Sequence, residues 1–307
     1  MTTSAASEYF STSEEQCYAN CRLAHYFQYE AGYAPAITNR KLSNGIIAHI
    51  GHEWLYREAP MDVVLGHMQD AIDKREAELK AASPKGVIPA ELVMDFVKDS
   101  ALVKAMIRDY PAWLKASGVD DGYETVSVEE ALEVQFPNTP YIFRGKLDLL
   151  QRHKTTGRLR VVDFKTRDKF YKDTMPYQLS EQNGNYQLAV TAVYGERPTE
   201  LAYREARKMN PETNPRSKPP YYQQIPIRLT KEEMLYRAKQ FAETANEAKD
   251  PERRIYANPG SCCGSWKNDW QGPCQLVHQG LTPEQALLES PNYKPKDPYA
   301  RYKEEAE

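Results

Sequence analysis

Two acidic residues and one lysine, each in a stretch that otherwise has the character of a buried β-strand, could form a hydrolytic site. Asp148 lies in RGKLDLLQRH, and Asp163 and Lys165 lie in LRVVDFKTR. Alternate residues of a strand share a face, so Asp163 and Lys165 point the same way. If the two stretches pair through the polar turn near residues 156–157, Asp148 lies beside Asp163 at one edge of the sheet.

Two neighbouring carboxylates repel each other unless a cation neutralises them. A hard divalent ion bound by oxygen atoms, Mg2+ or Mn2+, is the expected cation. Such an ion lowers the pKa of a bound water and polarises a phosphoryl oxygen, and two ions about 4 Å apart share these tasks. Lys165 would position the attacking water or stabilise the developing negative charge. These residues therefore predict hydrolysis of phosphodiester bonds.

The elements that must position these residues change in character at about residue 125. Before it, apolar residues at helical spacing predict helices over 13–32, 41–56 and 61–115, the last divided at Ser83-Pro84-Lys85-Gly86. After it, two-residue alternation predicts strands over 126–128, 132–136, 141–150 and 159–165. A helix over 180–195, strands over 200–208 and 221–229, and a helix over 230–249 follow. This order predicts an α/β fold with a central mixed β-sheet flanked by helices.

As a set, the residues resemble the PD-(D/E)XK nuclease superfamily, in the branch of RecB-type nuclease domains and their phage and CRISPR-associated exonuclease relatives. The matching residues are, in chain order, Gly45 and His49, Gly145 and Asp148, Asp163, Phe164 and Lys165, and Gln187. Leu147 stands where the superfamily name has proline. The resemblance implies a restriction-endonuclease-like core with a helical insertion.

In that family the histidine, both acids and the carbonyl after the second acid bind the metal, and the lysine is catalytic. The resemblance therefore assigns metal binding to His49, Asp148, Asp163 and the Phe164 carbonyl, and catalysis to Asp148, Asp163, Lys165 and Gln187. His52 lies three residues after His49 on nearly the same helix face and is the competing histidine. Glu133 occupies a position that is often glutamate in this branch.

The helix with the glutamine departs from the family pattern. A tyrosine is usual four residues after the glutamine, but Thr191 stands there, and Tyr186 or Tyr194 is the alternative. Together with Arg167 and Lys169, Tyr186 is a candidate contact to DNA, because phosphates need cations and exposed bases stack on aromatic rings.

The five cysteines are odd in number, which does not suggest a secreted disulfide framework. Some members of the branch hold an iron-sulfur cluster with one N-terminal and three C-terminal cysteines. By this resemblance, the candidate ligands of a [4Fe-4S] cluster are Cys21, Cys262, Cys263 and Cys274, with Cys17 or His278 as alternatives for the fourth. Ordinary free thiols and a structural zinc site remain open as alternatives.

Composition limits the class of function. The net charge of -3 and the pI of about 6.1 exclude a uniformly basic protein that coats nucleic acid, but they allow a local basic patch. The first residues lack a basic start followed by an apolar core, and no apolar run is long enough to cross a membrane. We therefore expect a cytoplasmic protein with no membrane partner.

We divide the chain into five segments: an N-terminal helical segment (1–35), a helical cap or insertion with the histidine motif (36–120), the nuclease core (121–256), a cysteine-containing segment (257–290) and a polar tail expected to be disordered (291–307). The leading hypothesis is a Mg2+- or Mn2+-dependent deoxyribonuclease. The resemblance favours an exonuclease that acts on single-stranded or duplex DNA ends in recombination, repair or phage replication.

Two alternatives remain from other classes. One is a non-catalytic DNA-binding module that keeps the fold, and the intact acids and lysine disfavour it. The other is the nuclease subunit of a helicase-nuclease complex. The chain has no Walker-type phosphate-binding motif, so a helicase or recombination partner would be a separate protein.

Overall fold

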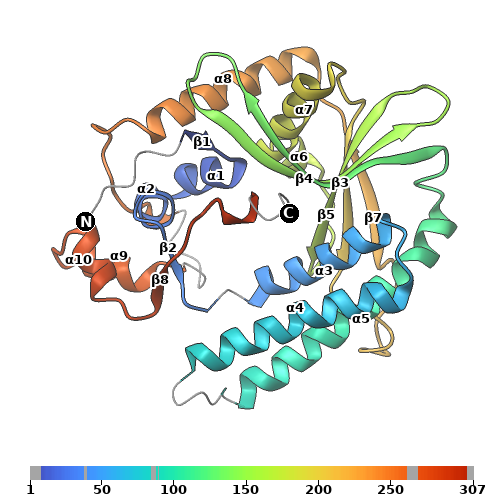
Figure 1. The fold of residues 1–307 in the computed structure, drawn as a ribbon, viewed down its shortest axis with the longest axis horizontal. Coiled ribbons are helices and arrows are strands. Elements are labelled where there is room, and N and C mark those ends of the chain that lie inside the picture. Colours follow the sequence, from blue (N-terminus) through green and yellow to red (C-terminus); the bar gives the residue numbers. More distant parts are fainter. Residues whose placement is uncertain (1–7, 38–39, 84–87, 89, 261–268, 303–307) are drawn as a thin grey trace.

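A mixed β-sheet of six strands forms the centre of the computed structural model, which describes residues 8–37, 40–83, 88, 90–260 and 269–302 (Figure 1). The strands are β1 (Tyr9–Phe10), β3 (Tyr123–Gln135), β4 (Ile142–His153), β5 (Leu159–Arg167), β6 (Leu201–Arg207) and β7 (Tyr222–Ile227). β4 pairs antiparallel with β3 and β5 and briefly parallel with β1. β5 and β6 are parallel, and β6 and β7 are antiparallel. The predicted α/β layout with a mixed sheet is confirmed.

Helices from the first half of the chain cover one face of the sheet. They are α3 (Arg40–Tyr56), α4 (Met61–Ala82) and α5 (Ala90–Ser117). Side chains of α5, such as Met106 and Tyr110, pack on Val162 and Phe164 of β5. The helix α4 packs on α3 and α5 through a separate apolar cluster, so the three helices form a layer below the sheet in Figure 1. This layer is the predicted helical insertion, broken between α4 and α5 where the sequence predicts.

Helices α7 (Glu181–Tyr194) and α8 (Lys231–Ala248) cover the other face, together with α1 (Thr12–Asn20) and the short α6 (Met175–Gln178). Three stacked or edge-on phenylalanine rings, Phe136, Phe143 and Phe241, lie in the core between α8 and the sheet. The predicted capping box of Thr230 and Glu233 begins α8, and Gly195 ends α7 in a left-handed conformation with φ of 67°.

The N-terminal helix is interrupted, unlike the single predicted helix over 13–32. Cys21 is extended, with φ of -163°, and separates α1 from α2 (Arg22–His25), which continues into a π-helical turn (Tyr26–Glu30). Apolar spacing does not show this break, because helical periodicity resumes directly after it. The break places the side chain of Cys21 in an apolar cluster.

The C-terminal segment packs beside these N-terminal helices. It contains α9 (Gln271–His278), α10 (Pro283–Leu288), β8 (Tyr293–Pro295) and a 3-10 turn (Ala300–Tyr302). β8 pairs with β2 (Tyr33–Pro35), and Tyr299 is buried. Residues 293–302 are therefore ordered, whereas the sequence predicts disorder from residue 291. Pairing with β2 outweighs the polar composition, the prolines and the lack of periodic apolar positions that favour disorder. Among the described helices, none combines the length and apolar character that a membrane crossing requires.

Candidate metal centre

The two predicted acids lie where β4 and β5 separate. Antiparallel pairing of these strands runs from Arg152 opposite Leu159 to Leu149 opposite Val162, and it ends one step before Asp148 and Asp163 would pair. Beyond this point β5 remains paired with β6. The backbone N–H of Phe164 instead donates to Asp148 Oδ2 at 2.7 Å. The side chain of Asp148 therefore lies against the backbone one residue after Asp163.

Helix α3 brings His49 to the same opening. Its Nε2 donates to the carbonyl oxygen of Phe164 at 3.0 Å, and its Nδ1 lies 3.4 Å from Asp148 Oδ1. His52, the competing histidine, is buried and stacks on the ring of Phe164, with the ring centroids 4.1 Å apart. His49 thus contacts the backbone of Phe164 and His52 contacts its ring, and His49 is the one that faces the acids.

Glu129 of β3 completes a group that the sequence analysis did not find. Among the described residues, one group could hold a metal ion, and it consists of His49, Glu129 and Asp148, whose ligand atoms all lie within 4.8 Å of one another. Glu129 has a φ of 54°, a left-handed conformation that is unfavourable for glutamate and that clusters at functional sites. Its neighbours in β3 pair with the residues on either side of Asp148, so Glu129 lies opposite Asp148.

Glu133, the glutamate expected from the resemblance, lies elsewhere. Its carboxylate pairs with Arg144, and its side chain is 47% exposed. Glu129 could have been found from the hairpin turn at residues 136–141. Antiparallel pairing counted back through that turn places Glu129, and not Glu133, opposite Asp148.

Asp163 and Lys165 form a second part of the site. Lys165 Nζ lies 2.7 Å from Asp163 Oδ2, and Asp163 is almost fully buried. Gln182, in the first turn of α7, connects the two: its Nε2 donates to Asp163 Oδ1 at 2.6 Å, and its Oε1 accepts from Lys165 at 2.9 Å. The amide therefore fixes both the acid and the lysine.

Gln187, the predicted catalytic glutamine, is buried inside the same helix layer, and its Nε2 donates to Asn183 Oδ1 at 2.7 Å. The glutamine that touches the acid and the lysine is Gln182, one and a half helical turns earlier. The spacing of residues in the sequence could have identified Gln182. Tyr186 follows Gln182 by four residues, as is usual in the family, whereas Thr191 stands four residues after Gln187.

Electrostatics distinguish the two acids. Burial favours the neutral form of Asp148, but the adjacent His49 and Lys165 outweigh it and hold the pKa of Asp148 below its ordinary value. Burial raises the pKa of Asp163 to about 6, against the opposing effect of Lys165 and with a contribution from Asp148. The pKa of His49 is raised, because Asp148 and Glu129 outweigh the effect of burial. In the metal-free site the carboxylates are thus neutralised by an imidazolium and an ammonium.

The donor set fits a hard divalent ion. It offers carboxylate oxygens, one imidazole nitrogen and the carbonyl oxygen of Phe164, the ligand types that Mg2+ and Mn2+ accept. A cation placed among them would take over the neutralising role of the His49 proton. His49, Asp148 and the Phe164 carbonyl are thus brought together with Glu129. Asp163 lies at the same opening but is not part of the group whose ligand atoms lie within 4.8 Å of one another.

The predicted DNA contacts have different surroundings. Lys169 is exposed. The Nε of Arg167 donates to Tyr177 Oη and to the buried Glu205, each at 3.1 Å. Tyr186 is buried, 8% exposed, against Gly145. Tyr194, its alternative, donates to Glu130 at 2.9 Å.

Three of the cysteines lie in one apolar cluster with Trp270 and Phe27: Cys17, Cys21 and Cys274. Burial, followed by the effect of Cys21, raises the pKa of Cys17 to about 12. The sulfur atoms of the described cysteines do not form a compact ligand group with one another or with a histidine or acid. Cys262 and Cys263 lie outside the described residues. His278, at the end of α9, is exposed.

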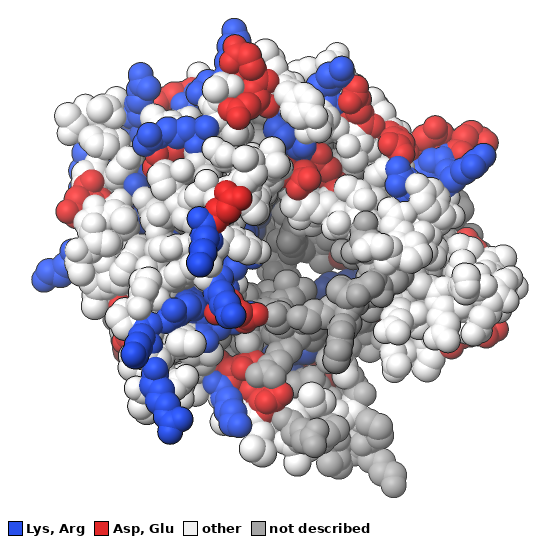
Figure 2. Space-filling model, turned by 180° about the vertical axis from the view of Figure 1, so that it is seen from behind, with Lys and Arg blue, Asp and Glu red and all other residues white. Residues whose placement is uncertain are grey.

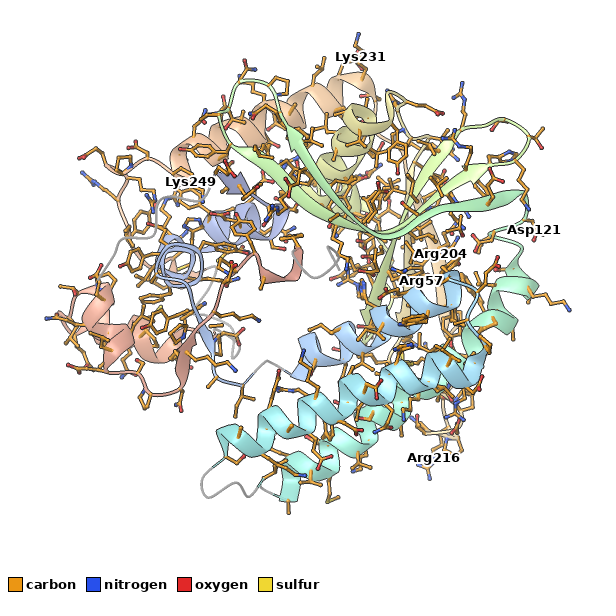
Figure 3. The ribbon with its side chains drawn as sticks, in the orientation of Figure 1. Arg57, Asp121, Arg204, Arg216, Lys231 and Lys249 are labelled. Atoms are coloured by element: carbon orange, nitrogen blue, oxygen red, sulfur yellow. The ribbon has the colours of Figure 1, made fainter. Side chains whose placement is uncertain are left out.

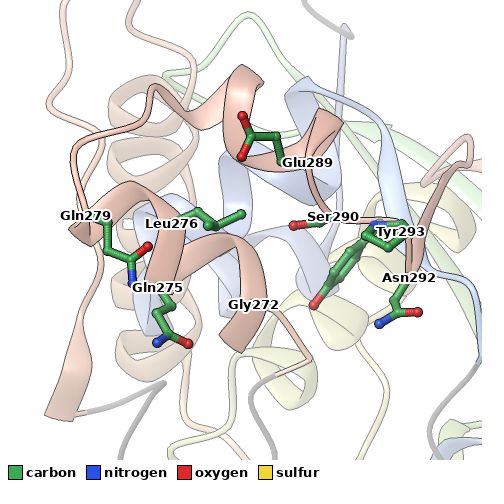
Figure 4. A pocket seen from close by; sticks show the side chains of 9 residues that line it. Gly272, Gln275, Leu276, Gln279, Glu289, Ser290, Asn292 and Tyr293 are labelled. Carbon is green, nitrogen blue, oxygen red and sulfur yellow. The ribbon is translucent and has the colours of Figure 1, made fainter.

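A pocket in the C-terminal segment lies next to this cysteine cluster, and its lining residue Tyr293 packs against the cluster (Figure 4). It opens between α9 and the turn from α10 to β8, and its wall includes Gln275, Gln279, Glu289 and Tyr293. None of the residues that line it belongs to the metal centre or is a cysteine.

Known structures and a protein family match this chain. Among solved structures, a candidate exonuclease from Eubacterium rectale is 14% identical over 78% of this chain and 80% of its own, with a TM-score of 0.45. The structure of SSO0001 is 14% identical over 59% of this chain and 84% of its own, with a TM-score of 0.27. No curated protein matches the chain in sequence. The family model of the PD-(D/E)XK nuclease superfamily matches residues 9–267, which include every residue of the candidate site, and the chain belongs to this superfamily.

Proposed function

We propose that this protein is a Mg2+- or Mn2+-dependent deoxyribonuclease that degrades DNA from its ends. The observation that carries the proposal is the convergence of His49, Glu129 and Asp148 beside the pair of Asp163 and Lys165, at the opening between β4 and β5. Membership of a nuclease superfamily supports the reaction class. Preference for DNA and for ends rests on the resemblance of the motif set to RecB-type and phage exonucleases.

The proposed roles are metal binding for one group of residues and charge stabilisation for Lys165. His49, Glu129, Asp148, Asp163 and the Phe164 carbonyl would hold the ion. When bound, the ion supplies charge stabilisation at the phosphate and a more acidic water. Lys165, held by Asp163 and Gln182, presents a positive charge at the edge of the opening, where it can orient the water or stabilise charge on the phosphate. Buried Asp163 keeps this ammonium in place.

Substrate contacts would come from the surface around the opening. Lys169, exposed, and Arg167 follow Lys165 along the chain and are the proposed phosphate contacts. Figure 2 shows Lys and Arg side chains gathered on one part of the face seen from behind, with acidic side chains among them. Such a local patch is compatible with the slightly negative net charge. A helicase or recombination partner and a role in repair, recombination or phage replication remain part of the proposal.

The test compares wild-type protein with Asp163→Ala on end-labelled linear and closed circular DNA, with Mg2+, Mn2+ or chelator. We expect metal-dependent loss of linear DNA only, and no activity in the variant. Glu133→Gln is the control. Glu133 is an acidic residue of the same sheet that lies outside the site, so this variant should keep full activity. Equal cutting of circles would exclude an exonuclease. Metal-dependent DNA binding without cleavage would favour the non-catalytic alternative.

We also propose that the cysteines bind a [4Fe-4S] cluster that joins the two ends of the chain. The proposal is supported by the burial of Cys21 and Cys274 in one cluster and by the backbone N–H of Asn258, which donates to Cys21 Sγ at 3.5 Å. Cys262 and Cys263 would supply the remaining ligands. Protein purified without oxygen should be brown and contain about four irons per chain. Colourless protein without iron would leave free thiols or zinc as the explanation.

A further inference from the structure

A polar network with two buried arginines lies behind the candidate metal centre, on the face of the sheet that α3 and α5 cover. Its centre is the carboxylate of Asp120, in the turn between α5 and β3. Tyr56, the last residue of α3, donates to Asp120 Oδ2 at 2.6 Å, and Arg204 of β6 donates to the same oxygen at 3.0 Å. A second nitrogen of Arg204 donates to Asp120 Oδ1. Figure 3 shows Arg204 beside the end of α3, near Arg57.

Arg204 uses its other donors as well. The side chain is 1% exposed, and it donates to Tyr110 of α5 at 3.1 Å, to Gln224 of β7 at 2.8 Å and to Tyr56. A second buried arginine, Arg160 of β5, donates to Asp120 Oδ1 at 2.5 Å. Two buried guanidinium groups around one carboxylate are costly to desolvate, and apolar side chains could hold the helices equally well. Such a network is better explained by the geometry that it fixes than by stability.

The geometry that it fixes is the position of α3 over Phe164. Arg204 lies directly opposite Phe164 in the parallel pairing of β5 with β6. His49, His52 and Tyr56 follow at helical spacing on one face of α3. His49 contacts the Phe164 carbonyl, His52 stacks on the Phe164 ring, and Tyr56 is bound to Arg204. The network therefore anchors the end of α3 to the strand next to β5, two helical turns beyond His49.

We propose that Arg204 and Asp120 are positioning residues of the metal centre. By binding Tyr56, they set the rotation and height of α3 so that the imidazole of His49 meets the Phe164 carbonyl and Asp148. Neither residue touches the ion or the substrate in this proposal. The inference rests on the proposed nuclease function, because it assigns the network to the ion site.

The experiment compares Arg204→Gln with a matched control, Arg237→Gln. Arg237 also bonds a buried carboxylate, that of Glu15 at 2.7 Å, but on the opposite face of the sheet. Both variants should unfold at lower temperature. Arg204→Gln should increase amide hydrogen exchange in α3 of the metal-free protein and weaken Mn2+ binding about tenfold or more, as loss of a group that orients a ligand does. Arg237→Gln should leave α3 exchange and Mn2+ affinity as in the wild type.

Tyr56→Phe is the milder variant. It removes one hydroxyl, should fold, and should weaken Mn2+ binding several-fold; unchanged affinity would overturn the inference even if Arg204→Gln does not fold. Wild-type Mn2+ affinity or unchanged α3 exchange in folded Arg204→Gln would also overturn it, as would equal weakening in Arg237→Gln. Each of these results leaves the nuclease proposal intact. Absence of Mn2+ binding by the wild type would overturn the proposed function and the inference together.

Discussion

At the scale of single residues, the site depends on a backbone conformation that alternation of side chains does not reveal. The acids, the lysine and His49 could be selected from the sequence because their spacing is regular. Glu129 could not be selected in the same way. Its φ of 54° is a left-handed conformation that the spacing of side chains does not predict, and only the register counted back through the turn at residues 136–141 places it opposite Asp148. Gln182 was missed because a second glutamine in the same helix fits a looser pattern.

Glu129 and Glu133 give a test of this difference. Replacing Glu129 with glutamine removes a charge within 3.8 Å of His49 Nδ1, so Mn2+ affinity should fall about tenfold or more. Replacing Glu133 with glutamine removes only an ion pair with Arg144 at the edge of the sheet, and Mn2+ affinity should not change. Calorimetric titration of both variants measures this. A larger loss of Mn2+ affinity for the Glu133 variant would assign metal binding to Glu133, the residue expected from the resemblance.

Asp163 gives the site a dependence on pH. Its pKa of about 6 lies above the ordinary value, so below about pH 6 the folded protein without metal holds a proton there that a bound ion must displace. His49 also holds a proton that the ion displaces, so Mn2+ affinity should rise with pH throughout this range, and by up to about tenfold more per pH unit below pH 6 than above it. The same shift means that Asp163 contributes less to stability as pH rises from about 4 to 6.

Titrations of Mn2+ at pH 5, 6 and 7.5 measure the effect on affinity. Asp163→Asn provides the control, since its affinity should be low and should lack the additional steepness below pH 6. An equal slope in the variant would assign the displaced proton to another group.

At the scale of the elements, pattern predicts most of the fold. The strands β4 and β5 begin and end within three residues of their predicted bounds, and the break between α4 and α5 falls where Ser-Pro-Lys-Gly predicts it. Local pattern fails at Cys21, where a helix breaks without a local cause. Contacts with residues far away in the chain decide that position, such as the bond from the N–H of Leu23 to the carbonyl of Tyr256.

The layer of α3 on α5 depends on a close approach at Gly51. A Cβ atom there would lie 2.6 Å from Ile107 Cγ1, so Gly51→Ala should push the helices apart and destabilise the protein by about 1–3 kcal/mol. Gly66 of α4 provides the control, because its surroundings are open and alanine there should stabilise by about 0.5–1 kcal/mol. Denaturant unfolding of both variants measures the difference. Stabilisation by Gly51→Ala would show that α3 and α5 can move apart without loss of stability.

At the scale of the whole molecule, hydrogen bonds and a strand pairing connect the N-terminal and C-terminal segments. Tyr299, near the C-terminus, donates to the carbonyl of Tyr9 at 2.9 Å and to the buried carboxylate of Glu14, and β8 pairs with β2. Composition alone predicts a disordered tail, since it describes the tail without the partner that orders it. The expected restriction-endonuclease-like core is confirmed, and these terminal contacts are an addition to it.

Truncation tests the importance of this closure. A protein that ends at residue 290 loses β8 and the buried ring of Tyr299, and it should be destabilised by about 2–4 kcal/mol, roughly the value of one buried aromatic side chain with its hydrogen bond. A protein that ends at residue 302 keeps these contacts and should unfold like the full chain. Thermal unfolding compares them. Equal stability of all three would show that the tail contributes nothing.

The parting of β4 from β5 has a mechanical consequence. At the acids, the hairpin of β3 and β4 and the strand pair of β5 and β6 share no ladder hydrogen bonds, and each would supply ligands to the proposed ion. A bound cation would act there as a cross-link between the two halves of the sheet. Metal binding should therefore reduce relative motion of the two halves of the sheet, and removal of the metal should restore it.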